Sequence, residues 1–402
     1  MPKPKVICVH IGARAHYLIP AALERNDQLH TLITDTWVGN SFWRYVLAKS
    51  PITAVRSLAG RYSSGIPNLK VQSFGWKFMI FELYLRLKST YSWEQTLARD
   101  EKFEAEAVRL LQKSTGANTI LGISYTSLKV FETASRKGLK KILFQVDPGF
   151  EEEELVASLA IASAHKTSWK RAPEHYWKQW RTECALADVI LVNSDWSKSG
   201  LTKQGIDAAK IAILPLPYTV TSRHQGFVRS YPRAFSKERP LRCLFLGTLA
   251  MRKGIHIVIE AAKALAEYPV EFIFVGRTEI NVQDLNGANM HYKGIITREE
   301  TDDAYQHADV FLFPTFSDGF GLTQLEAMAW KLPVIATDRC GEVVIDAYNG
   351  WRMHKPEAKE LVRIITEIIS DPLTLQAKAE NCLQTAARSS MENFLSDLSK
   401  LL

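Results

Sequence analysis

The sequence predicts an α/β protein built from two doubly wound domains that face each other across a cleft. The chain has 402 residues, too many for one ordinary hydrophobic core and about right for two of roughly 200 residues each. Its hydrophobic fraction of 46% and charged fraction of 23% are close to globular averages and argue against disordered and coiled-coil classes. Short apolar segments alternate twice with helical patterns along the chain, which is typical of parallel sheets covered by helices on both faces.

The first domain is predicted to span residues 1–218. Its expected strands are short apolar runs, and they lie at residues 5–11, 29–34, 119–122, 141–146, 189–193 and 211–214. Between them, segments such as 127–137 and 197–204 have the spacing of helices. This alternation of strand and helix predicts a Rossmann-like domain.

Residues 219–240 are polar and basic and contain Pro232 and Pro240, which marks them as the linker between the domains. The second Rossmann-like domain is predicted at residues 241–388. Its expected strands lie at 241–246, 270–275, 310–313 and 333–336, and its expected helices at 255–267, 299–307 and 323–330. Apolar side chains at helical spacing between Phe394 and Leu402 predict a separate C-terminal helix over residues 389–402. This helix is a candidate to cross back to the first domain.

Cysteine usage and the lack of long apolar runs predict the compartment. The five cysteines are odd in number and form no C-x-x-C pair, which argues for a reducing compartment and against a disulfide framework or a zinc site. No stretch reaches the roughly 18 apolar residues of a membrane span, and the N-terminal apolar run before Arg14 is too short for a secretory signal. We therefore expect a cytoplasmic protein.

The net charge of +7 is concentrated between residues 37 and 99. The basic residues of this stretch, opposed only by Glu82 and Glu94, are Arg44, Lys49, Arg56, Arg61, Lys70, Lys77, Arg86, Lys88 and Arg99. Aromatic residues are interleaved with them, namely Trp43, Tyr45, Trp76, Phe78, Phe81, Tyr84 and Tyr91. Such a composition is typical of a surface that contacts anionic lipid, or of aromatic core residues beside a solvated basic face. The stretch lacks a recognisable nucleic-acid module, so no nucleic-acid partner is expected.

The first loop whose residues could bind a ligand lies between an expected strand and an expected helix, at residues 247–254. Glycines at both ends let the backbone approach a ligand closely, and Arg252 and Lys253 bring positive charge to the helix N-terminus, where anions are already favoured. The loop predicts a diphosphate site. The alternative is a tight turn with solvated basic residues.

A second loop, residues 314–321, joins an expected strand to the helix that carries Glu326. Gly319 and Gly321 flank Phe320 and expose backbone N–H groups that suit hydroxyl or phosphate oxygens. Asp318 and Glu326 could both meet a ligand that lies across the helix end, and a carboxylate is a suitable acceptor for the vicinal diol of a ribose. Alternatively, the two acids serve as a helix cap and a helix-dipole partner.

Taken together, the two loops resemble the donor site of a known enzyme family. Residues 241–351 resemble the C-terminal domain of retaining glycosyltransferase family 4, also named glycosyltransferase group 1, which has the GT-B fold. The resemblance extends in outline to the whole chain. The matching segments are 247–254, 274–276, 293–294, 308–314, 318–329 and 333–336. The resemblance implies a glycosyltransferase of the kind found in bacterial polysaccharide synthesis.

Carried over position by position, the resemblance implies that Arg252 and Lys253 bind the donor diphosphate. It places sugar hydroxyls at Asp318 and the 319–321 backbone, and the ribose at Glu326. The donor-binding residues predicted in this way are Gly12, Arg14, Thr248, Arg252, Lys253, Gly276, Arg277, Ile295, Ile296, Asp318, Gly319, Phe320, Gly321, Leu322, Thr323 and Glu326. Ile295 and Ile296 are expected to meet the base through their backbone, and Thr323 and the backbone near Leu322 to meet phosphate.

The chain departs from the family pattern at two positions. Asp318 occupies the first position of the family's E-x7-E motif, so its reach to the sugar is about one methylene shorter than that of Glu. Thr248 follows Gly247 where the family often has Arg, and Arg252 is a candidate to supply that charge.

In the N-terminal half the candidates are fewer. Gly12 allows close backbone approach in the first loop, and Arg14 and His16 are its polar groups. Asp147 occupies a loop where family members often present a histidine. The catalytic candidates are therefore Asp318, Lys253, Arg252, His16 and Asp147. Ordinary roles remain open for His16 at a helix start and for Asp147 in a turn before proline, and residues 151–154 are expected to cap a helix.

The expected reaction is transfer of a hexose, glucose by default, from UDP-glucose to a glycan or lipid-linked acceptor. The resemblance implies retention of anomeric configuration by front-face attack. No D-x-D follows a strand, so neither a metal nor another cofactor is expected, and Arg252 and Lys253 would offset leaving-group charge. The alternatives are a GT-B nucleotide-sugar 2-epimerase and a non-catalytic sugar-binding protein. A peripheral position at the inner face of an anionic membrane is a further hypothesis.

Overall fold

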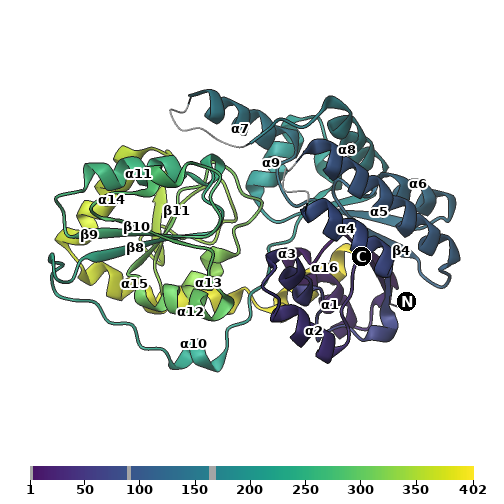
Figure 1. The fold of residues 1–402 in the computed structure, drawn as a ribbon, viewed down its shortest axis with the longest axis horizontal. Helices are drawn as coiled ribbons and strands as arrows, with labels where there is room; N and C mark the ends of the chain where they lie inside the picture. The colour runs from purple at the N-terminus through teal and green to yellow at the C-terminus, as the bar shows by residue number, and fades with distance from the viewer. Residues whose placement is uncertain (1–2, 88–91, 163–168) are drawn as a thin grey trace.

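The computed structural model describes residues 3–87, 92–162 and 169–402. These residues form two α/β domains, each built around a parallel sheet (Figure 1). The predicted α/β class with two doubly wound domains is confirmed. Lys88 and Tyr91 of the basic aromatic stretch lie outside the described residues.

The N-terminal sheet has the strand order β3-β2-β1-β4-β5-β6-β7, and every adjacent pair is parallel. Its strands are β1 Val6–His10, β2 Leu29–Thr34, β3 Val71–Ser73, β4 Thr119–Ile123, β5 Lys140–Phe144, β6 Val189–Val192 and β7 Ile211–Ile213. The accompanying helices are α1 Leu18–Arg25, α2 Ser41–Ala48, α3 Thr53–Arg56, α4 Trp76–Leu87, α5 Trp93–Lys113, α6 Leu128–Arg136, α7 Phe150–Ala162, α8 Glu174–Leu186 and α9 Asp195–Lys203. The strand order reverses at β1, which lies between β2 and β4, so the loops after β1 and β4 flank a crevice at the carboxyl ends of the strands.

The C-terminal sheet has the order β10-β9-β8-β11-β12-β13. Its strands are β8 Leu241–Leu246, β9 Val270–Val275, β10 Met290–Gly294, β11 Val310–Phe313, β12 Val334–Thr337 and β13 Gly350–Met353. The main helices are α11 Ile255–Ala264, α12 Arg298–His307, α13 Thr323–Ala329, α14 Ala358–Ser370 and α15 Leu373–Arg388. α11 and α14 cover one face of the sheet while α12, α13 and α15 cover the other (Figure 1). The order reverses between β8 and β11, and this puts the 247–254 and 314–321 loops side by side.

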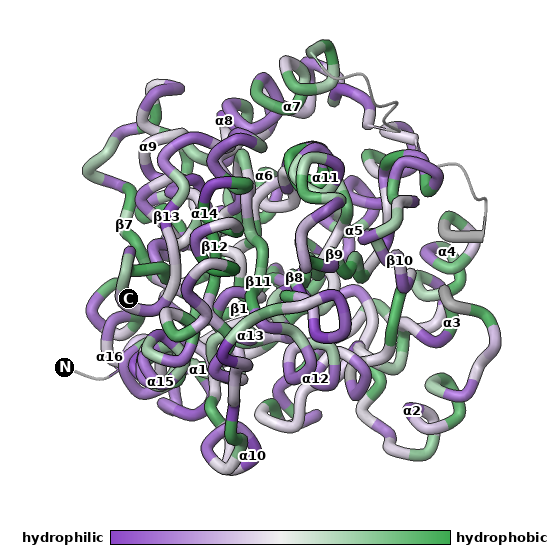
Figure 2. Tube along the Cα trace, turned by 90° about the vertical axis from the view of Figure 1, so that its left-hand side faces the viewer, coloured by the Kyte–Doolittle hydropathy of each residue, from purple (hydrophilic) through white to green (hydrophobic). Residues whose placement is uncertain are grey.

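Burial of apolar strands between helix layers accounts for both cores. Figure 2 shows the apolar strands β8 and β11 inside a shell of helices of mixed hydropathy, and all four residues of β11 are buried. Strands buried on both faces read as continuous apolar runs, which is why their sequences are recognisable. Among the described residues, no helix is long and apolar enough to cross a bilayer.

The chain passes between the domains twice. The first connection follows β7 and includes α10 Ser222–Gly226. Near its end, the buried guanidinium of Arg229 donates to the carbonyl groups of Trp330 and Tyr305 and so packs against the C-terminal domain. The second connection leads to α16 Met391–Leu401, which lies against α1 of the N-terminal domain (Figure 1). The Tyr218 N–H donates to the Ser389 carbonyl at 2.7 Å and joins the two connections.

A buried ion network fixes the loop after β1. Arg61, predicted within the basic stretch, is only 8% exposed, and its guanidinium contacts Asp35 and Glu82 at 3.0 Å each. Asp35 also accepts from the Gly12 N–H at 3.1 Å. Arg61 therefore contributes to the core of the domain rather than to a basic surface.

Replacing Arg61 by Met is expected to lower the free energy of unfolding by about 3–5 kcal/mol, because two buried carboxylates lose their cation. Urea unfolding followed by circular dichroism measures this change. The same substitution at exposed Arg233 serves as the control and should change stability by less than about 0.5 kcal/mol. A loss of similar size in both variants would contradict the role of the network.

Candidate active site

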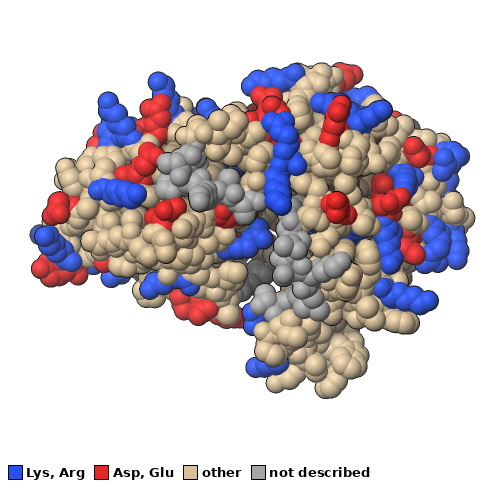
Figure 3. Space-filling model, turned by 45° about the horizontal axis from the view of Figure 1, so that its top comes forward, with Lys and Arg blue, Asp and Glu red and all other residues tan. Residues whose placement is uncertain are grey.

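A cavity of ≈ 480 Å³ lies between the two domains, where the carboxyl ends of both sheets face each other. From the C-terminal domain it is lined by residues of both glycine loops and of the start of α13, among them Thr248, Arg252, Lys253, Asp318, Phe320, Gly321, Leu322 and Thr323. From the N-terminal domain it is lined by Arg14, Ala15, Phe144, Val146, Asn193 and Leu216. Figure 3 shows Lys and Arg side chains along the boundary between the two domains. Most of the predicted donor-binding residues therefore line one cavity.

The two glycine loops are packed and hydrogen-bonded to each other. The carbonyl of Arg252 accepts from the Phe316 N–H at 2.8 Å and from the Thr315 hydroxyl at 3.1 Å. Gly254 has a φ of +79°, and a Cβ at this position would collide with the carbonyl oxygen of Pro314. Only glycine satisfies both conditions, so Gly254 allows the cationic loop to lie directly against the 314–321 loop.

Each cation of the first loop is paired with a carboxylate. The Lys253 ammonium contacts the Asp318 carboxylate, and the Arg252 guanidinium lies 3.5 Å from Glu152. Burial, followed by the positive charge of Arg252, lowers the pKa of Lys253. An anion that entered beside Lys253 would favour the protonated form of this lysine. Lys253 is therefore suited to exchange its carboxylate partner, Asp318, for a phosphate group.

The 317–321 loop is also bound to the N-terminal domain. Ser317 donates its hydroxyl to Glu152 at 2.5 Å and accepts from the Trp196 indole N–H at 3.0 Å. The Ser194 hydroxyl donates to the Gly319 carbonyl at 2.7 Å. These three hydrogen bonds connect the loop that carries Asp318 to α7 and to the start of α9.

Glu152 is the site residue that sequence reasoning missed, because the 151–154 run was interpreted as a helix cap. It lies in the first turn of α7, and burial raises its pKa while the charge of Arg252 opposes the shift. Its partners Arg252 and Ser317 belong to the other domain. The only local signal was its position after the loop that follows β5.

Several predicted donor residues lie outside the lining of this cavity. Glu326 is half-buried on α13 and accepts from the Tyr305 hydroxyl at 2.9 Å. Gly276 packs against Gly247 at the end of β9, and Ile295 is 71% exposed after β10. The other two predicted residues of this group are Arg277, which is exposed and pairs with Glu279, and Ile296, which is half-buried. All of these residues lie beyond the carboxyl ends of strands β9, β10 and β11. Their contacts with the donor stay predictions.

In the N-terminal domain the structure separates the candidates. Arg14 lines the cavity, but Gly12 and the exposed His16 do not. The Gly12 N–H donates a hydrogen bond to Asp35 instead. Residues 15–17 have φ values of 46°, 50° and 57°, so the loop is a left-handed turn of non-glycine residues. Such backbone is strained and tends to occur at functional sites. Ala15, in this turn, lines the cavity.

Asp147 lines a second, smaller cavity of ≈ 280 Å³. Its Oδ1 accepts from the Gln145 amide and from the Gly149 N–H at 2.9 Å each, and from the Tyr125 hydroxyl. The hydrogen bond from the Gly149 N–H is the one expected of an aspartate that forms a turn before proline. Arg252 lines both this cavity and the one of ≈ 480 Å³, so the two spaces meet at its guanidinium.

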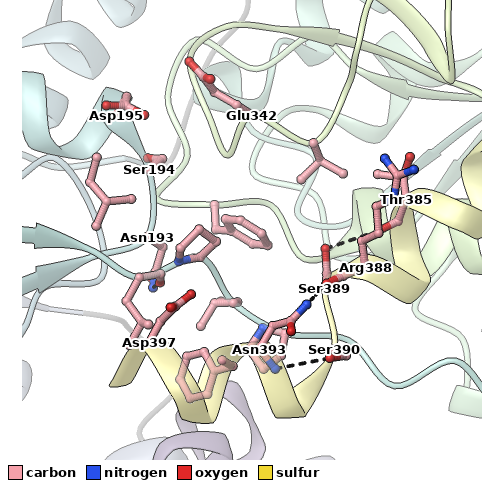
Figure 4. A pocket seen from close by; sticks show the side chains of 18 of the residues that line it. Asn193, Ser194, Asp195, Glu342, Thr385, Arg388, Ser389, Ser390, Asn393 and Asp397 are labelled. Atoms are coloured by element: carbon pink, nitrogen blue, oxygen red, sulfur yellow. Dashed lines mark hydrogen bonds between the residues drawn. The ribbon is translucent and has the colours of Figure 1, made fainter. Parts of the chain in front are cut away.

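A third cavity, of ≈ 680 Å³, lies beside the crossing connections. Figure 4 shows side chains of α15, α16 and the β6–α9 loop around it, with Asp195 and Glu342 above the cavity and Arg388 and Asp397 on opposite sides of it. Of the predicted site residues it contains Phe320 alone among the described ones. It lacks both cations of the 247–254 loop, so the cavity of ≈ 480 Å³ is the better candidate for an anionic ligand.

Comparisons with known proteins identify relatives of the chain. Residues 231–389 match the family described as glycosyl transferases group 1. The capsular polysaccharide biosynthesis glycosyltransferase CapM of Staphylococcus aureus is 28% identical over 137 residues, which cover 32% of this chain and 36% of CapM. The N,N'-diacetylbacillosaminyl-diphospho-undecaprenol alpha-1,3-N-acetylgalactosaminyltransferase of Campylobacter jejuni is 27% identical over 260 residues, or 60% of this chain and 63% of that protein. The chain thus matches less than two thirds of the length of these relatives.

Solved structures share the whole fold. HepE of Anabaena in complex with UDP has a TM-score of 0.64 at 16% identity, with 98% of each chain covered. Sucrose-phosphate synthase of Thermosynechococcus elongatus has a TM-score of 0.65 at 16% identity, covering 99% of this chain and 98% of that one. The two domains therefore adopt the GT-B fold, and residues 231–389 of the C-terminal one match the glycosyl transferases group 1 family.

Proposed function

We propose that this protein is a glycosyltransferase that moves a hexose from a nucleotide sugar to a glycan or lipid-linked acceptor. The observation that carries the proposal is the placement of Arg252, Lys253 and Asp318 on one cavity between the domains. UDP-glucose is the proposed donor, retention the proposed outcome, and the reaction needs no metal. The roles of relatives in capsular polysaccharide synthesis and on a diphospho-undecaprenol substrate support the proposed acceptor class, and UDP in the HepE structure supports the proposed nucleotide.

In the proposed reaction, the charge that develops on the leaving diphosphate is met by Arg252 and Lys253. Fixed cations in a partly desolvated cavity stabilise such charge without reorganisation. Donor entry would separate Lys253 from Asp318 and free the Asp318 carboxylate for sugar hydroxyls. The bond between the anomeric carbon and the diphosphate breaks as the acceptor oxygen attacks the same face, and the departing diphosphate takes the acceptor proton. No protein nucleophile is assigned.

Replacing Lys253 by Met should weaken UDP-glucose binding about ten- to hundredfold, because one charge-assisted contact to phosphate is lost. Thermal unfolding with UDP-, GDP- and ADP-glucose measures binding, since a ligand that binds only the folded state raises the midpoint. UDP-glucose should give the largest shift.

Two controls sharpen this test. Lys263→Met removes an exposed lysine from the far end of α11 and should leave binding and transfer as in the wild type. NMR analysis of the products distinguishes transfer from a released 2-epimer. Transfer by Lys253→Met or Glu326→Gln at the wild-type rate would overturn the site assignment.

Replacing Glu152 by Gln should strengthen UDP binding about two- to fivefold, because a carboxylate that competes for Arg252 is removed. Calorimetric titration with UDP measures the change. The matched control is Glu154→Gln, on the same helix as Glu152, which alters an exposed ion pair with Arg171. Weaker UDP binding by Glu152→Gln would show that Glu152 supports the donor site instead of competing for it.

We further propose that the acceptor is reached at an anionic membrane surface. Exposed rings gather on α2 and α4, where Phe42, Trp43, Tyr45 and Trp76 are each 57–65% exposed. Residues 36–81 contain no acidic side chain. Aromatic rings beside lysines such as Lys77 match the headgroup region of a bilayer.

The protein should float with vesicles that contain phosphatidylglycerol, and less so as salt is raised, because salt screens the attraction. Phe42→Ser with Trp43→Ser should abolish flotation, whereas Tyr268→Ser, at a 49% exposed tyrosine of the other domain, should not. Absence of wild-type flotation would refute the membrane proposal without bearing on glycosyl transfer.

A further inference from the structure

We infer that the cavity of ≈ 280 Å³ beside Arg252 binds the acceptor, and that it takes an uncharged sugar ring in preference to a phosphate- or carboxylate-bearing group. The inference rests on the proposed glycosyl transfer. The cavity volume is just below the roughly 300–1,000 Å³ range of small-molecule sites, which suits a single sugar ring. It opens next to the donor cavity, because Arg252 lines both. A ligand in it would be adjacent to the proposed leaving group.

Aromatic rings form one wall of this acceptor cavity. The rings of Tyr125 and Tyr176 stack with centroids 5.1 Å apart and an interplanar angle of 15°. The Trp93 ring lies 5.0 Å from Tyr176, and Trp169 and Trp177 also line the space. Flat, apolar ring faces suit the C–H face of a pyranose, while their rigidity keeps the entropy cost of binding low.

The aromatic wall is held in place by buried polar contacts. Tyr125 has a left-handed backbone, with a φ of +77°, directly after β4. Its N–H donates to the buried Glu183 carboxylate at 2.7 Å, and its hydroxyl donates to Asp147. The Trp177 indole N–H donates to Glu153. Backbone strain maintained by such contacts at a cavity is typical of a ligand site.

The carboxylates that line the acceptor cavity determine which sugars it accepts. Asp147, Glu152, Glu153 and Glu279 all line the acceptor cavity, and Arg252 is its one basic residue among the described ones. This excess of negative charge disfavours phosphate and uronate groups. Hydroxyl groups, in contrast, can donate to carboxylate oxygens. The hydrogen bonds that the described residues give to Asp147 end on Oδ1, so Oδ2 keeps its capacity to accept from a sugar hydroxyl.

The two cavities therefore differ in charge as their proposed ligands do. The donor cavity presents Arg14, Arg252 and Lys253 to a diphosphate, and the acceptor cavity presents aromatic faces and carboxylates to a neutral ring. An acyl chain fits the second cavity poorly, because it would cover the Oδ2 atom of Asp147 without donating a hydrogen bond to it.

Saturation-transfer NMR in the presence of UDP tests the inference with defined probes. Methyl glycosides of glucose, galactose and N-acetylglucosamine are compared with their 6-phosphates. At least one uncharged glycoside should bind, and its 6-phosphate should bind about tenfold more weakly or not at all. Tyr176→Ala should weaken binding of that glycoside about tenfold or more, whereas Tyr176→Phe, which keeps the ring, should retain it.

Controls separate this inference from the proposed function. Tyr268→Ala removes an exposed tyrosine of the C-terminal domain and should bind the probes like the wild type. The UDP-induced thermal shift of Tyr176→Ala should match that of the wild type and shows that the variant is folded. Equal binding of the 6-phosphates, or wild-type binding by Tyr176→Ala, overturns the inference while the UDP shift persists. Loss of the UDP shift in the wild type would instead overturn the proposed function.

Discussion

The geometry of the site depends on the hydrogen bonds that hold the 317–321 loop between the two domains. Ser317 bridges Glu152 and Trp196, and Gly319 accepts from Ser194. Gly319 also approaches the Val146 backbone too closely for any side chain. Because the loop carries Asp318, the position of this carboxylate is set by contacts to both domains at once. Any relative movement of the domains would therefore break these hydrogen bonds to the loop that carries Asp318.

The same contacts explain how several charges are accommodated in a partly buried space. Unpaired buried ions cost several kcal/mol each, so buried charges occur in pairs. Lys253 pairs with Asp318, and Arg252 with Glu152. In the proposed reaction a donor diphosphate would replace these carboxylates as the partner of both cations. The ion pairs would then preserve the cationic site when no donor is bound, at the cost of competing with it.

Strain and burial in the N-terminal domain complement this arrangement. The left-handed turn at residues 15–17 and the left-handed Tyr125 follow β1 and β4, the strands at which the order of the sheet reverses. The buried Asp35, Arg61 and Glu82 network fixes the loop after β1, and Glu183 fixes the backbone after β4. Conformations that cost energy are therefore held by buried, hydrogen-bonded polar side chains at the crevice that faces the donor loops.

Local patterns in the sequence were sufficient for the fold class and for both glycine loops, because strand and helix periodicity and turn glycines depend on neighbouring residues. They did not reveal β3, β10 or β13, which are short and lie at or near the sheet edges, with residues that are largely half-buried or exposed. Nor did they distinguish the buried Arg61 from the exposed cations around it. The Glu152–Ser317 contact joins residues 165 positions apart, and the two cavities meet at Arg252 only when the domains face each other. These features were decided by tertiary structure alone, since the energy of a buried charge is determined by partners that the chain brings together only on folding.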